Sequence, residues 1–517
     1  MFQEGFLCHL RVKGKNGRIY VYEVESFWNK EKKKPDSHRK CIGHIDEQTG
    51  EIVSNRPRAK NGTGLRQVKT ETPITVSKTG SYSIVDKAAD QTGLLDCLQK
   101  VFPVRWPHIM TCCQFLATTG SPLYLIDRWS AHNETFLPDG IISQRVSDLL
   151  SSLTLSEQQE FFRAWIAHNQ TNEYFALDIT SVSSYSELIS LVKYGYNRDH
   201  EPLPQINLLM ITGQKSKLPV YFMPLDGKIK DVKALKAVLD NQKLITPKML
   251  SLIMDKGFFS AANVDALYKG RFRFAVGVPF SSKLARDAVE KYRDTIENHH
   301  NVISVSDDDV YGVTELQKWN GHRLYLHVYF DSDKAAGERK TFNRKLHRTY
   351  RALCAGETVE DEKFAEQYFI VKETKVRGRK VEYNEEEIDN HMKNRVGWFV
   401  MASNFIKDTA EALTVYREKD SVEKSFDDLK NQMDMKRLRV HSEEAMNGRI
   451  FIQFLTLILT VWIRQKLSET KWADKYSYRE IMSEISELKK ISVEGKRKDL
   501  AFQTTNLQNQ IIELFGL

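Results

Sequence analysis

Residues 416–430 have the sequence YREKDSVEKSFDDLK, which combines aromatic, acidic and basic side chains in one short stretch. If these residues form one helix, Tyr416, Glu423 and Lys430 are spaced by seven, about two turns each, and project from one face. Lys419 follows Tyr416 by three residues, on the same side. Such a face carries an aromatic hydroxyl, a carboxylate and two ammonium groups, which suit a metal ion and a phosphodiester. For an isolated helix a solvated charged face is the commoner explanation, so the choice depends on residues upstream.

Two aspartates stand at apolar strands upstream of this stretch. Asp178 lies inside YFALDIT at 174–180, and Asp255 ends an apolar strand ahead of Lys256. A buried carboxylate without a partner is costly, so each needs a cation, a metal ion or several hydrogen-bond donors. For either aspartate alone, capping a turn after the strand is an equally good explanation. Three carboxylates at the ends of core elements, beside a basic helix face, favour a site for two Mg²⁺ ions about 4 Å apart.

The composition is that of a globular, multidomain protein, and its modest basic excess is compatible with an anionic partner, although many ordinary enzymes are as basic. The chain has 517 residues, 41% hydrophobic and 28% charged, and a net charge of +8. Its six cysteines show no disulfide spacing, which suits a reducing cytoplasm. The N-terminus has no expected signal peptide, and the apolar run 450–463 is shorter than the ~20 residues of a membrane span, which predicts a core helix. No nucleophile signature and no Walker loop is present.

Changes in hydrophobic period divide the chain into expected regions. The 91–168 region is helical and is either a reader of DNA ends or an ordinary helical subdomain, two alternatives of equal weight. Strand and helix patterns alternate before residue 281 and after residue 395, and this alternation predicts a mixed sheet in an α/β domain. Residues 281–395 between them have a different sequence pattern. The full expected order is a β-rich module at 1–60, a linker at 61–90, the helical region at 91–168, a first part of an α/β core at 170–280, a mostly β insertion at 281–395, a second part of the core at 396–468 and a helical C-terminal region at 469–517.

These residues bring a family into view. The order Asp178, Asp255, Glu423, with Tyr416-x2-Lys419-x3-Glu423-x6-Lys430 around the last, resembles the DDE transposases of bacterial insertion sequences. Within them it is similar to the insertion sequence 4 type, which has a spaced Tyr-Arg-Glu-Lys signature. Supporting matches are FALDITS, MDKGF, GWFVMAS, SFDDLK, the segment MKRLRVHSEEAMNGRIFIQFLTL and the opening YVYEVESFW…CIGHID, so the resemblance spans most of the chain.

One position departs from the family pattern. The contiguous letters YREK at 416–419 are accidental, because the signature is spaced and its glutamate is Glu423. Lys419 therefore occupies the place of the signature arginine. Lysine keeps the positive charge but lacks the planar fork that grips a phosphate with two hydrogen bonds.

The resemblance implies a fold like ribonuclease H, with Asp178 on its first strand, Asp255 at the end of its fourth and Glu423 on a helix after the insertion. The three carboxylates would bind two Mg²⁺ ions per active site, with Mn²⁺ as a substitute. Tyr416, Lys419 and Lys430 would hold DNA phosphates. The implied chemistry is hydrolysis at the 3′ ends of the element and then attack of each 3′-OH on target DNA. The implied partner is double-stranded DNA, both terminal inverted repeats and target, bound by a homodimer on paired ends.

Further DNA contacts are predicted outside the signature. Trp319 is our candidate for an aromatic residue that stacks on a flipped base, against the alternative of a core residue in a β module. Basic clusters suit phosphate contacts, although any one of them alone is more often a solvated surface. The arginines in these clusters are Arg271, Arg273, Arg377, Arg379, Arg437 and Arg439.

Two rival functions remain at this point. One is a ribonuclease H-like, metal-dependent nuclease that cleaves without strand transfer. The other is a transposase-derived DNA-binding protein without catalysis. An intact carboxylate triad counts against the second, because a binding protein has no need of it.

Overall fold

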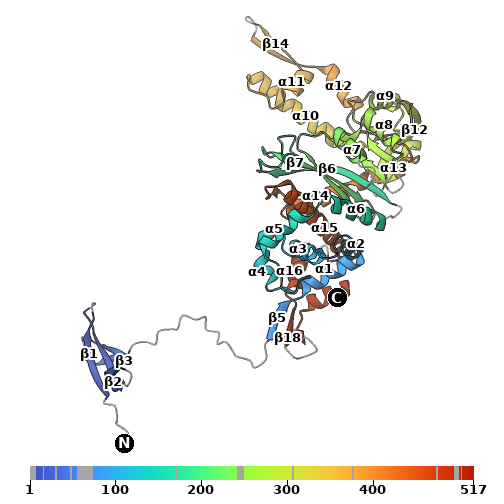
Figure 1. Cartoon of the computed structure of the whole chain (residues 1–517). Coiled ribbons are helices and arrows are strands. Elements are labelled where there is room, and N and C mark those ends of the chain that lie inside the picture. The colour runs from blue at the N-terminus through green and yellow to red at the C-terminus, as the bar shows by residue number, and fades with distance from the viewer. Residues whose placement is uncertain are drawn as a thin grey trace. The chain divides into compact units, whose positions relative to one another are not determined.

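The computed structural model describes residues 7–517 apart from 15–16, 30–31, 47–48, 55–73, 170–172, 241–249, 306–307, 375–377, 473–474, 494–499 and 502. The chain forms two compact units, Met1–Pro73 and Ile74–Leu517 (Figure 1). The first unit is an antiparallel sheet in the order β1-β2-β3-β4. Its strands are β1 (Leu7–Lys13), β2 (Ile19–Asn29), β3 (Lys34–Ile45) and β4 (Ile52–Ser54). The β-rich character expected at the N-terminus is thus confirmed.

The second unit begins with a strand and a set of helices. They are β5 (Ile74–Lys78), α1 (Gly80–Gln91), α2 (Leu94–Val101), α3 (Trp106–Thr119), α4 (Ile126–Ser130), α5 (Ser143–Ser152) and α6 (Leu155–His168). Residues 74–90 were expected to belong to a linker, and this was wrong, whereas 61–73 lie outside the described residues. β5 pairs with β18 (Lys489–Val493), and α1 buries Ile84 and Val85. The pairing partner is more than 400 residues away, so local composition gave no sign of it.

The core of this unit is a mixed sheet. Its order is β11-β12-β13-β16-β10-β9-β6-β7-β8, with β17 also paired to β6. The first five strands along the chain are β6 (Tyr174–Ser184), β7 (Gln205–Gly213), β8 (Pro219–Asp226), β9 (Ser251–Met254) and β10 (Arg273–Gly277). β6, β7 and β8 are antiparallel neighbours, while β9 runs parallel to both β6 and β10. This is the mixed sheet expected of a ribonuclease H-like core.

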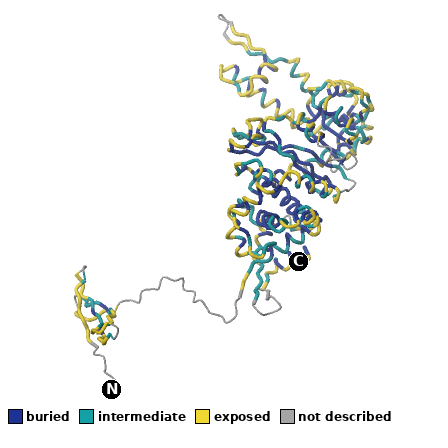
Figure 2. The backbone as a smooth tube through the Cα atoms, in the orientation of Figure 1, coloured by how far each residue is buried: buried dark blue, intermediate teal, exposed yellow. Residues whose placement is uncertain are grey.

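Helices cover this sheet because its strands are apolar on both faces. Every residue of β7 is buried, as a strand between two helical layers requires (Figure 2). The long helix α15 (Glu443–Ser468) packs on α3, α5 and β8. Among the described residues it is the single helix long and apolar enough by itself to cross a membrane, and 89% of its apolar window is buried in the protein. The core helix predicted at 450–463 is confirmed.

The insertion is not the separate, mostly β module that was expected. β11 (Val302–Val305), β12 (Asp308–Trp319) and β13 (His322–Phe330) extend the central sheet through β16 (Trp398–Ser403). The strand signal at 323–330 corresponds to β13, whereas β11 and β12 were not predicted, and a strand pattern does not identify the sheet that the strand joins. The remainder is largely helical and has its own small core around Phe342, and it projects from the end of the sheet (Figure 1). It comprises α10 (Ser332–Ala355), α11 (Glu362–Tyr368), the hairpin β14 (Phe369–Thr374) and β15 (Gly378–Tyr383), and α12 (Glu385–Asn394).

Shorter elements complete the unit. α7 (Asp231–Asp240) and α8 (Ala261–Lys269) connect strands of the central sheet, and α9 (Lys283–Tyr292) opens the insertion. After β16 come α13 (Thr409–Arg417), α14 (Ser421–Gln432) and β17 (Arg437–Leu438). The chain ends with α16 (Tyr478–Ser486), β18, β19 (Leu500–Ala501) and α17 (Asn506–Phe515).

Candidate active site

Asp178 and Asp255 lie side by side because their strands are parallel neighbours. Leu177 of β6 pairs with Met254 of β9. Asp178 directly follows Leu177, and Asp255 directly follows Met254. Burial raises the pKa of Asp178 to about 6, and the charge of Asp255 adds to the rise. The amide of Ile179, which donates to Asp178 Oδ1 at 2.7 Å, opposes it. The sequence prediction that two strands bring these carboxylates together is therefore met by the geometry.

Tyr416 reaches this pair from α13. Its hydroxyl donates to Asp255 Oδ1 at 2.7 Å. The contact needs a glycine opposite, since a Cβ at Gly277 would lie 2.8 Å from the Tyr416 hydroxyl oxygen. Gly277 ends β10 one residue after Val276, which pairs with Met254, so it is level with Asp255. Tyr416 thus orients the carboxylate of Asp255 in this structure. Gly277 is a further residue of the site, and no sequence pattern singled it out.

The stretch 416–430 is not one continuous helix, contrary to the sequence prediction. α13 ends at Arg417, a 3-10 turn covers Glu418–Asp420, and α14 begins at Ser421. Asp and Ser are residue types that favour the start of a helix over its interior, which fits a break here. The seven-residue spacing therefore does not align Tyr416 with Glu423 on one face.

Lys419, in the turn between the two helices, links the parts of the site. Its Nζ lies 5.2 Å from the centre of the Tyr416 ring and 4.0 Å from Glu423 Oε1. Its charge also lowers the pKa of Asp178, against the larger effect of burial. Glu423 is 63% exposed. The structure therefore brings Asp178, Asp255, Tyr416 and Lys419 together and leaves Glu423 one ion pair away from them.

The two aspartates fit a divalent cation, although a complete triad is not assembled. Within the described ranges, no three His, Cys, Asp or Glu side chains stand close enough to share a metal ion. Asp178 and Asp255 nevertheless form an anionic pair, and the raised pKa of Asp178 shows that nearby cations do not fully offset its burial. Carboxylate oxygens are the ligands that Mg²⁺ prefers. A divalent ion would relieve both the burial and the mutual repulsion.

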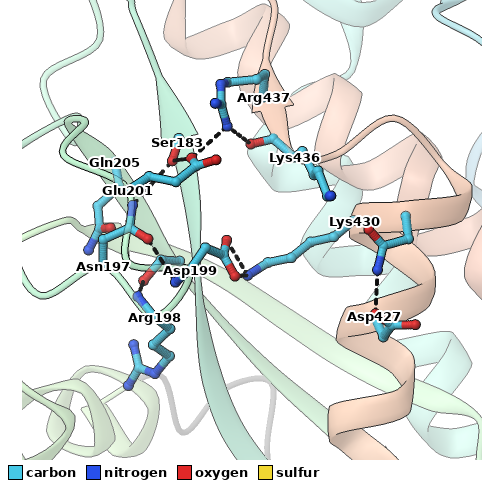
Figure 3. A network of polar contacts seen from close by, with 12 residues as sticks. Ser183, Asn197, Arg198, Asp199, Glu201, Gln205, Asp427, Lys430, Lys436 and Arg437 are labelled. Atoms are coloured by element: carbon cyan, nitrogen blue, oxygen red, sulfur yellow. Dashed lines mark hydrogen bonds and ion pairs between the residues drawn. The ribbon is translucent and has the colours of Figure 1, made fainter.

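Lys430, expected to hold a phosphate, is paired inside the protein. Its Nζ donates to both carboxylate oxygens of Asp199 at 2.7 Å, and only 11% of its side chain is exposed (Figure 3). Asp199 belongs to the 185–204 loop between β6 and β7. The same loop supplies Glu201, which accepts from Arg437 at 2.6 Å (Figure 3). Arg439 lies 3.5 Å from Asp434. Three predicted DNA contacts therefore already have carboxylate partners.

The 185–204 loop also carries a cation that sequence reasoning missed. Arg198 lowers the pKa of Asp178, and its Nη2 donates to Asp231 Oδ1 at 2.7 Å. It comes from the polar stretch YNRDHEPLP, which has no periodicity or motif to single it out. Arg198 and Lys419 thus act on Asp178 from two separate elements.

Other predicted contacts lie away from the carboxylates, contrary to the expectation that they surround the site. Trp319 pairs with His322 five rows along the sheet from the level of Asp255, about 16 Å by strand geometry, and its ring packs on Phe259 at 5.1 Å. Arg271 and Arg273 stand at the start of β10, whereas the aspartates are level with Gly277 at its other end. The sequence grouped these arginines with the site as a basic cluster and did not show which end of the sheet they reach. Arg379 is exposed on β15, and Arg377 lies outside the described residues.

Cavities open beside Asp255. One of about 320 Å³ is lined by Asp255, Tyr416, Lys256 and Lys334, among others. Lys256 and Lys334 also line a larger cavity of about 1210 Å³, which extends between the sheet and helices α10 and α11. Asp255 is thus accessible from a side that carries lysines.

Comparison with known proteins gives two findings. Residues 170–459, more than half of the chain, match the family described as "Transposase DDE domain". Among solved structures, the chain is similar to the piggyBac transposase in its synaptic complex with hairpin DNA, determined by cryo-EM. The identity is 12% and the TM-score 0.33, over 78% of this chain and 70% of the other. No curated protein sequence matches the chain.

Proposed function

This chain belongs to the transposase DDE domain family, and we propose that it cleaves DNA at the ends of an insertion sequence and joins those ends to target DNA. The observation that carries the proposal is the pair of adjacent aspartates on parallel strands, with the Tyr416 hydroxyl on one and the Lys419 charge near the other. The spaced signature around Glu423 supports assignment to the insertion sequence 4 type.

We propose Asp178, Asp255 and Glu423 as the residues that hold two Mg²⁺ ions, or Mn²⁺ in their place. Divalent ions in such sites offset charge on the reacting phosphate and lower the pKa of bound water. The two aspartates already lie together, and Glu423 lies next to Lys419, which is close enough to Asp178 to affect its pKa. We propose that Glu423 joins the pair when metal and DNA are bound.

The other residues near the pair position substrate and carboxylates. Tyr416 holds Asp255 in place through its hydroxyl. Lys419, Lys256 and Lys334 give the approach to the aspartates a positive charge, which suits a phosphodiester. Asp178 must lose its proton before it can bind a cation, so activity should fall as pH falls below about 6. Lys430 would contact a phosphate only after its pairing with Asp199 is exchanged.

Partners and location follow from the same proposal. We propose that the chain binds double-stranded DNA, both terminal inverted repeats and target, and that it works as a homodimer on paired ends. The helical region at 91–168 is the proposed reader of the ends. A cytoplasmic location suits such an enzyme and the free cysteines of the described residues.

The test is cleavage and joining of a DNA fragment that carries the sequences flanking the gene, with and without Mg²⁺. Asp255→Asn and Glu423→Gln should each abolish both steps. Asp427→Asn is the matched control, because Asp427 is exposed on α14 one turn after Glu423. Full activity of Glu423→Gln would show that the triad is wrong. Cleavage without joining would identify a nuclease, and binding without cleavage a non-catalytic DNA-binding protein.

A further inference from the structure

Helix α10 presents a basic stripe on the face opposite its core. Phe342, Leu346 and Leu353 are buried on one side of the helix. On the opposite side lie Lys340, Arg344, His347 and Arg351, and these four residues are called the α10 stripe below. Their spacing of four, three and four residues keeps them on one line along the helix. The stripe was not among the sequence-predicted DNA contacts.

The cations of the stripe lack carboxylate partners. Within the part of the chain that the structure describes, each of the four is exposed and none forms an ion pair. Their neighbours on the same helix do: Lys345 pairs with Asp361 and Arg348 with Glu360, both at 2.7 Å. Like charges spaced by four along a helix repel one another. The stripe is therefore an uncompensated positive surface, which an anionic partner would relieve.

The dimensions of the stripe suit a DNA backbone. From Lys340 to Arg351 the helix rises about 16 Å, which equals the axial rise of about five base pairs of B-form DNA. A hollow of about 670 Å³ lies on this face, lined by Arg344, His347, Arg348 and Arg351 together with one carboxylate, Glu357. At the end of α10, an Arg379 Nη1 lies 3.7 Å from where a Cβ at Gly356 would stand. Arg379 is therefore a further cation at the C-terminal end of the helix.

The helix also connects this surface to the aspartates. Lys334, in its first turn, lines the cavity that contains Asp255. From there α10 runs outward from the sheet (Figure 1). DNA that enters the site at Lys334 and follows the helix would meet the stripe next.

We infer that the α10 stripe binds the phosphate backbone of duplex DNA next to the segment held at the aspartates, without reading its sequence. The choice of DNA as the partner rests on the proposed function. Contacts of Lys and Arg to phosphate carry no sequence information, and each releases counterions, so the number of contacts is measurable from the salt dependence of binding.

The experiment measures binding of a fluorescent duplex of arbitrary sequence to the full chain over a range of NaCl concentrations. The stripe variant is Lys340→Gln/Arg344→Gln/Arg351→Gln. Its matched control is Lys291→Gln/Lys380→Gln/Lys393→Gln, which removes three cations of the same insertion that are similarly exposed but paired with Glu315, Glu382 and Asp389. Both variants lose the same net charge. Circular dichroism spectra of both variants are compared with that of the wild type to check that the fold is retained.

The stripe variant should lose about 2.7 from the slope of log K against log salt, about 0.9 for each lost contact, and the control less than about 1. An unchanged slope in the stripe variant, or equal losses in both variants, would overturn the inference. Binding of polyglutamate instead of duplex would also overturn it, in favour of an acidic protein partner. If the wild type binds no duplex at all, the proposed function itself fails, so the two failures are distinguishable.

Discussion

Two basic regions of this protein differ in what their cations already contact. On α14 and β17, Lys430 and Arg437 pair with Asp199 and Glu201 of the 185–204 loop. On α10, the three cations of the stripe and His347 have no such partner among the described residues. Both regions look alike in sequence, since each is a run rich in Lys and Arg. The difference teaches that the carboxylate partners, which come from a distant loop, decide whether a basic cluster is available to DNA.

The two basic regions differ in what a DNA phosphate must displace when it binds. A phosphate that binds Lys430 must displace Asp199 and leave that carboxylate to be solvated, so the net gain is small. A phosphate that binds the α10 stripe displaces only counterions, which gain entropy on release. The paired region therefore mainly holds the protein together, and the unpaired one is free for a partner.

The largest expected effect is on DNA cleavage, and it should leave DNA binding by the α10 stripe nearly unchanged. Asp255→Asn should reduce Mg²⁺-dependent cleavage by at least about 100-fold, because one of the two adjacent carboxylates loses its charge. Duplex binding through the α10 stripe should stay within about twofold of the wild type. Single-turnover cleavage and equilibrium binding on the same protein measure the two quantities. Parallel loss of both would mean that the regions are not independent.

Unfolding free energy distinguishes the paired cation from the unpaired one. Lys430→Met should lower the free energy of unfolding by about 1–2 kcal/mol, because Asp199 is left without its partner in a partly buried place. Lys340→Met should change it by less than about 0.5 kcal/mol. Urea denaturation of the two variants measures the difference. Equal values would remove the structural role assigned to Lys430.

The pH dependence of stability tests the buried carboxyl group of Asp178. The folded pKa of Asp178 is raised from 3.8 to about 6, so the folded state binds the proton more tightly than the unfolded state. Stability from this group is fully present below about 3.8 and is lost as pH rises to about 6. Asp178→Asn, which cannot ionise, should therefore match the wild type in acid and exceed its stability at neutral pH, in metal-free buffer. A stability difference that does not change with pH would contradict the raised pKa.

The smallest expected effect tests the pairing of Lys430 during DNA binding. Asp199→Asn should strengthen duplex binding by about three- to tenfold, since Lys430 no longer has to exchange a partner. In a Lys430→Met background the same substitution should have less than about half that effect on the binding free energy. A double-mutant cycle in the binding assay gives this coupling. Without coupling, Asp199 would act only through the general field of its charge.

The sequence predicted the strands of the core well, because apolar runs such as INLLMIT have clear ends. It also placed Asp178 and Asp255 at apolar strands, and the family resemblance implied that they share a site, whereas the parallel pairing of those strands is known from the structure alone. It failed where the outcome depended on distant partners. The carboxylates on Lys430 and Arg437 come from a polar loop without a pattern, and β12 and β13 join the central sheet through β16. The break at 418–420 interrupts a charge pattern that looked continuous.

The pairing of β5 with β18 has a consequence for synthesis. Strand β5 emerges from the ribosome about 400 residues before its partner, which at 5–20 residues per second is roughly 20–80 seconds. Helix α1 likewise packs on α15 and α16, both of which come much later in the chain. The helical region therefore cannot complete its packing until residues 443–493 have been translated. A truncated polypeptide that stops before residue 489 would leave β5 without its neighbour, and would be exposed to proteolysis before it could act on DNA.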